Sequence, residues 1–306
     1  MRVTETTRAT TLLTAIEQQM TAMNTLNEEL ATGYKVNEPS DDPVATGAIL
    51  RTNSYIAELN ENASVINTAQ NFSQAASTAM SDSSSILSDV QTAAVQAANG
   101  TESASDLQAL GSEVNQDLNA LTQDANSQFE GQYLFSGTKT DTAPIAVTRD
   151  SEGNIQDITY QGSDTDLTFP VGQGRSSPAS VTAQAAYMNV LSAVESFRND
   201  LNNMQGLSTA DQQTALSNDL SAINAAQSSF TAQAAEVGSY QSQLTSLSTQ
   251  TQTSLTNAQS ILSNYQDADV AQVSVNLQTA QTLYQAIVSS GASQMQQADL
   301  FSYLTA

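Results

Sequence analysis

The two ends of the chain carry matching narrow stripes of apolar residues, spaced alternately three and four residues apart. One stripe runs from Ala9 to Gly33 and the other from Val270 to Phe301. A spacing that averages about 3.5 residues puts one stripe along one side of a helix and requires a partner helix to cover it. The sequence therefore predicts terminal coiled-coil helices that pair with each other or with copies of the same chain. The subunit-packing seam predicted from these stripes comprises Leu12, Ile16, Met23, Leu26, Leu30, Val273, Leu277, Ala280, Tyr284, Ile287 and Phe301.

Composition removes several classes of function. The 306 residues include 8 Lys and Arg against 31 Asp and Glu, for a formal net charge of −23. Such a chain repels phosphate backbones and anionic lipid headgroups, so we expect no nucleic acid or membrane partner. The chain also lacks Cys and His, which removes thiol nucleophiles, imidazole bases and the usual zinc ligands. We therefore expect no enzyme, cofactor or metal site.

Targeting signals are equally sparse. No apolar run approaches the roughly 18 residues of a membrane-spanning helix. Residues 1–30 lack the continuous apolar core of a secretory signal and contain four Glu residues. If the protein is exported, we expect a route that does not use a cleaved signal peptide.

The pattern of the chain predicts long helices on both sides of a short β-rich segment. Only 39% of the residues are hydrophobic and many of these are Ala, which favours thin, closely packed helices over a wide core. After Pro39 and Pro43, proline occurs only at 144, 170 and 178. Its absence from 179–306 is what long helices require. We expect helices over 4–32, 44–98, 105–128, 183–205, 211–262 and from Val270 to about 303, and strands over 145–148, 155–160 and 167–171.

These elements predict a mainly α fold. It is an elongated rod of long antiparallel helices with paired terminal coiled-coil helices and a small β-rich insert in mid-chain. Because the order of elements is nearly a palindrome, the two termini should lie side by side. The expected domains are 1–35 with 266–306 as a terminal helical domain, 36–140 with 181–265 as a helical rod, and 141–180 as the insert.

Three local patterns have both a functional and a structural interpretation. The adjacent carboxylates of Asp41 and Asp42 precede Pro43, which is typical of helix capping rather than of catalysis. The segment 150–154 lacks the ligand spacing of a calcium loop and reads as a hairpin turn. Tyr284 could anchor a partner subunit or fill space between two helices of one subunit, and the sequence favours neither.

Four strings of residues resemble the flagellin-like axial proteins of the bacterial flagellum. Residues 30–37 followed by 39–43 are similar to the signature at the end of the family's first helix. The string 131–140 is similar to one at the exit from the helical domain, and 277–286 and 300–304 match near the C-terminus. Pro43 and the string 131–140 favour the branch of hook-associated protein 3 over flagellin. The motif positions are Gly33, Asp41, Asp42, Pro43, Tyr133, Phe135 and Gly137.

The resemblance implies a structural component that connects the flagellar hook to the flagellin filament through helix packing between subunits. The implied partners are further copies of the chain in a ring, a hook-associated protein on the hook side, flagellin on the filament side, and an export chaperone. The implied location is the extracellular flagellum, reached by type III export. The alternatives are a short flagellin that forms the filament itself, and a binding module carried on the β insert.

Overall fold

A computed structural model describes residues 5–100, 102–151, 153–172, 174–204 and 207–304, with only the helical backbone at 5, 6, 8 and 294–304. The chain divides into two compact units. Unit 1 comprises Met1–Glu58 and Ser254–Ala306, and unit 2 comprises Leu59–Thr253. Both boundaries fall inside long helices, so each of these helices contributes to both units.

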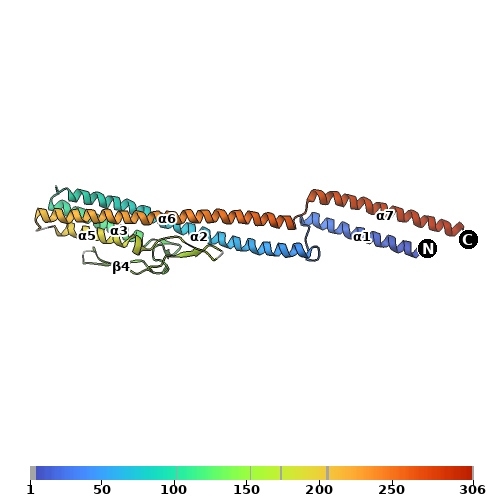
Figure 1. The fold of residues 1–306 in the computed structure, drawn as a ribbon, viewed down its shortest axis with the longest axis horizontal. Helices are drawn as coiled ribbons and strands as arrows, with labels where there is room; N and C mark the ends of the chain where they lie inside the picture. The colour runs from blue at the N-terminus through green and yellow to red at the C-terminus, as the bar shows by residue number, and fades with distance from the viewer. Residues whose placement is uncertain (1–4, 101, 152, 173, 205–206, 305–306) are drawn as a thin grey trace. The chain divides into compact units, whose positions relative to one another are not determined.

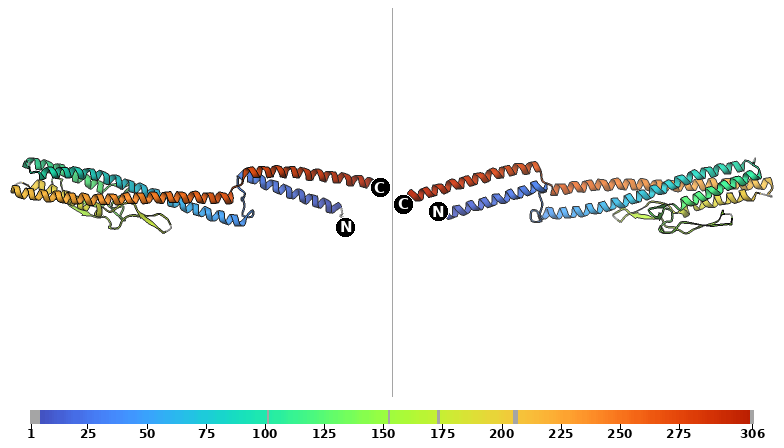
Figure 2. Two further views of the ribbon diagram at one scale, coloured as in Figure 1. Left: turned by 45° about the horizontal axis from the view of Figure 1, so that its top comes forward. Right: turned by 180° about the vertical axis from the view of Figure 1, so that it is seen from behind.

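Unit 1 is built from the two ends of the chain. Helices α1 (Glu5–Thr32) and α7 (Val270–Leu304) lie side by side and antiparallel (Figure 1). The unit also holds the start of α2 (Pro43–Ala98) and the end of α6 (Thr209–Gln266), which run side by side in the further views (Figure 2). The expectation that the termini lie together is confirmed within this unit.

The helix boundaries in unit 1 follow from local hydrogen bonding. Gly33 ends α1 with φ of +77°, a conformation that most other residues adopt only with strain. The Asp42 carboxylate caps α2 by accepting from the backbone N–H groups of Val44 and Ala45, both at 2.9 Å. Asp269 caps α7 in the same way through Ala271 and Gln272. These caps satisfy N–H groups that have no partner within the helix.

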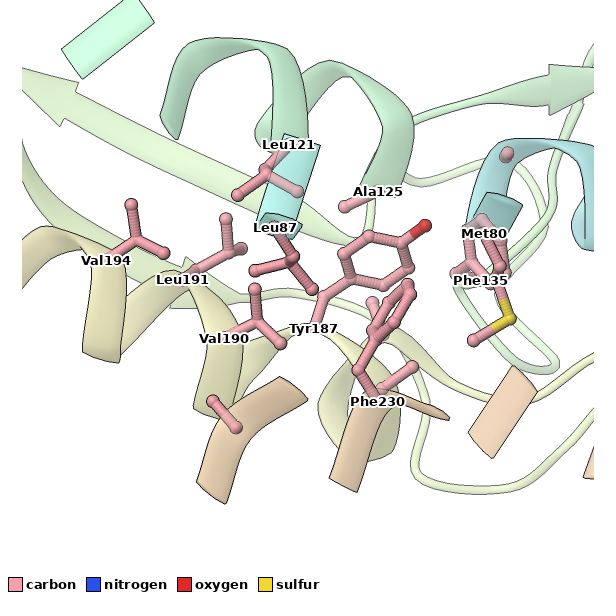
Figure 3. Close-up of a cluster of buried hydrophobic side chains, with 14 of the residues drawn as sticks. Met80, Leu87, Leu121, Ala125, Phe135, Tyr187, Val190, Leu191, Val194 and Phe230 are labelled. Atoms are coloured by element: carbon pink, nitrogen blue, oxygen red, sulfur yellow. The ribbon is translucent and has the colours of Figure 1, made fainter. Parts of the chain in front are cut away.

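Unit 2 is a helical bundle with a β-rich flank. Its helices are the remaining parts of α2 and α6 together with α3 (Ala104–Ala125), α4 (Ala183–Ala186) and α5 (Met188–Asn203). The core is centred on Tyr187, whose ring contacts Phe135 and Phe230 at centroid distances of 5.0 and 5.3 Å (Figure 3). Leu, Val and Ala side chains from the helices enclose these rings, as the 3.6-residue periodicity of their apolar positions requires.

The strands of unit 2 form three antiparallel pairs within the described residues. Strands β3 and β4 make the expected hairpin, and β5 is the expected strand interrupted by Pro170. The two-residue strands β1 and β2 and the partner of β5 were not predicted, because such short segments carry no period-2 signal. The bounds are β1 Gln128–Phe129, β2 Gln132–Tyr133, β3 Ile145–Arg149, β4 Ile155–Tyr160, β5 Thr168–Pro170 and β6 Ser176–Pro178.

One buried cation fastens the β3–β4 hairpin to the bundle. Arg198 lies on α5 and is almost completely buried. Its guanidinium donates to the carbonyl oxygen of Ile155 at the start of β4 and to Asn115 Oδ1 on α3 at 2.8 Å. Burial lowers the pKa of Arg198, but the group remains charged because arginine titrates far above neutrality. The guanidinium therefore links α5, α3 and the hairpin.

Replacing Arg198 by Met tests this link. The apolar side chain retains much of the volume but leaves the Ile155 carbonyl without its donor. We expect the free energy of unfolding of unit 2 to fall by about 2 to 3 kcal/mol. Chemical denaturation checks this value, with exposed Arg175→Met as the matched control. A loss equal to that of the control would mean that Arg198 does not hold the hairpin.

Candidate subunit-packing site

The predicted seam lies along the contact between α1 and α7, but it is only partly covered there. Val273 and Ala280 on α7 are buried. The remaining predicted seam residues with described side chains, Leu30 excepted, are half-buried: Leu12, Ile16, Met23, Leu26, Leu277, Tyr284 and Ile287. Two helices alone cannot enclose residues of this size, so the pair leaves apolar surface accessible.

Two contacts fix the register of α1 against α7. Gln19 Nε2 donates to the carbonyl oxygen of Ala280 at 3.1 Å, across the seam. Further along, Gly291 is buried directly against Leu12, and a Cβ atom at position 291 would overlap the Leu12 side chain. The absence of a side chain at Gly291 is therefore what lets the helices approach at this level.

Two predicted seam positions differ from the rest. Leu30 is 38% exposed, and the neighbouring Glu29 is half-buried in its place. A straight helix has about 3.6 residues per turn, so a stripe spaced at about 3.5 residues drifts by roughly 20° per heptad away from the partner. The side chain of Phe301 lies outside the described residues.

The outer surface of the pair carries further apolar side chains. On α1, Leu13 is 59% exposed and Met20 is 50% exposed, seven residues apart on one face. On α7, Val275 is 61% exposed and Leu283 is 50% exposed. Large apolar side chains repeated along a helix pair are typical of a surface that is covered by another molecule. The pair thus presents contact surface in addition to its internal seam.

Introducing a side chain at Gly291 should separate the two terminal helices. Because Leu has a higher helix propensity than Gly, a loss of order in Gly291→Leu would come from packing and not from the helix itself. We expect amide hydrogen exchange in α1 and α7 to accelerate at least tenfold. Gly238→Leu on α6 is the matched control, because a Cβ atom there meets no atom within 4 Å. Unchanged exchange in Gly291→Leu would show that the close approach does not hold the pair together.

The motif at 33–43 forms a tightly bonded link between α1 and α2. The Gly33 carbonyl accepts from the backbone N–H of Ala268 and the Lys35 N–H donates to the carbonyl of Gln266, each at 2.8 Å, which ties the link to the connection between α6 and α7. The Asp41 carboxylate accepts from the N–H groups of Asn37 and Glu38, and these bonds lower its pKa. Pro43 occupies the first position of α2, where its missing N–H costs nothing.

The motif at 131–140 organises unit 2. Tyr133 pairs with Gln128 between β1 and β2, and its N–H donates to the Thr140 carbonyl at 2.9 Å. The buried ring of Phe135 packs on Tyr187. Gly137 has φ of +62°, and a Cβ atom there would overlap the carbonyl oxygens of Ser163 and Thr165. The motif at 33–43 therefore lies in unit 1 and the motif at 131–140 in unit 2.

The carboxylates considered in the sequence have structural partners. Asp41 and Asp42 accept backbone N–H groups, and Asp150 accepts from the N–H of Asn154 at 2.9 Å in the β3–β4 turn. Among the described residues, no cluster of three or more acidic side chains is arranged to hold a metal ion. No helix in the described ranges combines the length and apolarity needed to cross a membrane.

Sequence reasoning assigned no role to the buried polar groups of unit 2, and besides Arg198 two of them are notable, Ser83 and Asp219. Ser83 on α2 donates to Asp124 Oδ2 at 2.9 Å and shares a hydrogen bond with the Tyr187 hydroxyl at 3.1 Å. Asp219 on α6 is buried beside the carboxyl of Asp200 on α5, and desolvation together with Asp200 raises its pKa to about 7. Each group lies on an apolar face of its helix, which was the one signal available in the sequence.

The fold and the partly covered seam define a class of protein: a mainly helical protein whose terminal helices pair with each other and leave apolar surface accessible. Comparison with known families specifies the class. The model of the bacterial flagellin N-terminal helical region matches residues 3–140, and that of the C-terminal helical region matches residues 220–304. Together these matches cover more than half of the chain. The chain belongs to the bacterial flagellin family.

Individual relatives come from two branches of this family. Flagellin FlaB1 of Treponema pallidum is 26% identical over 275 residues, covering 89% of this chain and 87% of that protein. Flagellar hook-associated protein 3 of Salmonella typhimurium is 28% identical over 138 residues, 44% of each chain. The flagellar junction protein FlgL of Legionella pneumophila has a similar fold, with a TM-score of 0.59 at 15% identity, over 72% of this chain and 100% of that one. The family models and the two named sequence relatives belong to structural proteins of the flagellum, and they point to a structural role for this chain.

Proposed function

We propose that this protein joins the flagellar hook to the filament, with copies arranged in a ring and held by helix packing. The observation that carries the proposal is the terminal pair, whose seam residues are mostly half-buried and whose outer face carries Leu13, Met20, Val275 and Leu283. Burying such side chains stabilises an assembly by roughly 1.5 to 3 kcal/mol each. Neighbouring subunits supply the surface that a single α1–α7 pair lacks.

Two features favour a junction protein over a filament subunit. Pro43 is the first residue of α2, and the string 131–140 contributes Phe135, whose ring packs against Tyr187 in the core of unit 2. Pro43 and the string 131–140 are also the features by which the sequence resembles hook-associated protein 3. In its described part, the insert adds only short antiparallel strand pairs, which suits a small domain on the outer surface of the assembly.

A filament-forming flagellin is the second candidate. It is favoured by the Treponema flagellin, which matches along 89% of this chain. The two candidates share the same packing principle and differ in copy number, because a ring requires few copies and a filament requires thousands. On the hook side the proposed neighbour is another hook-associated protein, and on the filament side it is flagellin. Export occurs without cleavage of a signal peptide and with the help of a chaperone.

Deletion of the gene tests the proposal. We expect cells with hooks but no filaments, and flagellin released into the medium. Complementation with the unaltered gene should restore filaments. Normal filaments in the deletion strain would rule out the junction role, and loss of the filament protein itself would favour the flagellin alternative.

A further inference from the structure

A groove on unit 1 lies away from the terminal pair. It is lined on α2 by Arg51, Thr52 and Tyr55, and on α6 by Asn257, Ala258 and Ile261, and its volume is about 300 Å³. Tyr55 is 41% exposed and Ile261 is 48% exposed. The helices α2 and α6 run side by side along this stretch (Figure 2). The groove therefore combines a cation with two large apolar side chains, Tyr55 and Ile261, that are only partly covered within the subunit.

The cation of this groove is not used to build the fold. Lys35, Lys139, Arg149 and Arg198 each donate to a backbone carbonyl oxygen. Arg51 makes no hydrogen bond or ion pair within the part of the chain that the structure describes, although Lys and Arg together number only 8 in the whole sequence. An unpaired guanidinium beside an aromatic ring is a preformed partner for a carboxylate.

We propose that this groove binds a carboxylate-bearing surface of a second copy of this chain, an inference that rests on the proposed ring. Charge complementarity selects this occupant. Each copy carries 31 acidic residues and a net charge of −23, so copies brought together repel one another unless a cation meets a carboxylate at the contact. Partial burial by Tyr55 and Ile261 strengthens that ion pair, and an Arg with a Tyr is a common interface anchor.

Photo-crosslinking tests the contact in assembled flagella. A photoreactive phenylalanine derivative placed at Tyr55 should give a product of twice the subunit mass, and peptide mass spectrometry should identify both partners as this chain. Adding Arg51→Gln should reduce the yield at least tenfold. Arg175→Gln is the matched control, because Arg175 is likewise exposed and without a partner among the described residues, but lies on the insert. Its yield should equal that of the unaltered chain.

The outcomes separate this inference from the proposed function. If the protein lies at the junction but crosslinks only to a different flagellar protein, or to none, the groove does not bind a second copy. An unchanged yield in Arg51→Gln also overturns the inference. Absence of the protein from flagella would overturn the proposed function and the inference with it. Equal thermal unfolding of the Arg51→Gln and unaltered monomers would show that a lost crosslink does not arise from misfolding.

Discussion

Replacing Tyr187 by Ala is expected to lower the free energy of unfolding of unit 2 by about 3 to 5 kcal/mol. The side chain is completely buried between Phe135 and Phe230, and Leu87, Leu121 and other core residues surround it (Figure 3). Truncation leaves a cavity and removes two ring contacts. It also removes the hydroxyl partner of Ser83, which is itself buried. Calorimetry should show the melting temperature falling by on the order of 10 °C.

Tyr187→Phe is the matched control for this result. It keeps the ring and removes only the hydroxyl, and Ser83 keeps its bond to Asp124. We expect a loss of about 1 kcal/mol, the usual net contribution of one hydrogen bond. If Tyr187→Ala cost no more than Tyr187→Phe, the rings would not form the core of the bundle.

The second large effect is expected at Asp219. Its buried carboxyl lies beside Asp200, and its pKa is raised from 3.8 to about 7. Between about pH 4 and pH 7, the folded protein therefore keeps a proton on Asp219 that the unfolded chain has already released. The stability that this proton provides is complete below pH 4 and is lost as the pH rises to 7. We expect Asp219→Asn to stabilise unit 2 at pH 8 by up to about 4 kcal/mol, since one pKa unit corresponds to about 1.4 kcal/mol.

Denaturation measured between pH 4 and pH 8 checks this prediction. The unaltered chain should lose stability with rising pH, and Asp219→Asn should lose much less. Asp117 has a pKa raised to about 6 by burial and by Glu113, so part of the slope should remain in the variant. Exposed Asp141→Asn is the control and should leave the slope unchanged. A variant that is less stable than the unaltered chain at pH 8 would contradict this account of Asp219.

The long helices could be predicted because their signals extend over many turns. The expected 44–98 is observed as α2, Pro43–Ala98, and the expected 211–262 is observed as α6, Thr209–Gln266. The predicted helix over 183–205 is instead divided at Tyr187 into α4 and α5. The division falls at the residue whose ring enters the core, and a tertiary contact of that kind leaves no mark on local periodicity.

The candidate site was only partly accessible from the sequence. The alternation of three and four residues identified which sides of α1 and α7 could meet, and Val273 and Ala280 are buried on those sides. The alternation could not show that Leu30 is exposed beside α7, because the drift between 3.5 and 3.6 residues per turn accumulates along a helix. Neither could it assign a role to Arg51, since the groove depends on how α2 and α6 lie together.

Buried polar residues were the least predictable feature of unit 2. Arg198 and Asp219 are both charged residue types, and a charged side chain is usually exposed. Arg198 is buried where three elements supply acceptors at one point, and the packing of Asp219 against Asp200 buries its carboxyl and raises its pKa. These conditions exist only after α3, α5, α6 and the β3–β4 hairpin have packed, so no local pattern reports them.

The most direct measurement for the account as a whole is the position of the protein in the intact organelle. Immunogold electron microscopy of isolated flagella, with an antibody raised against the insert 141–180, would locate it. We expect a single band of label at the boundary between hook and filament. Label along the whole filament would identify a flagellin instead, and the absence of label at the boundary would contradict the junction role.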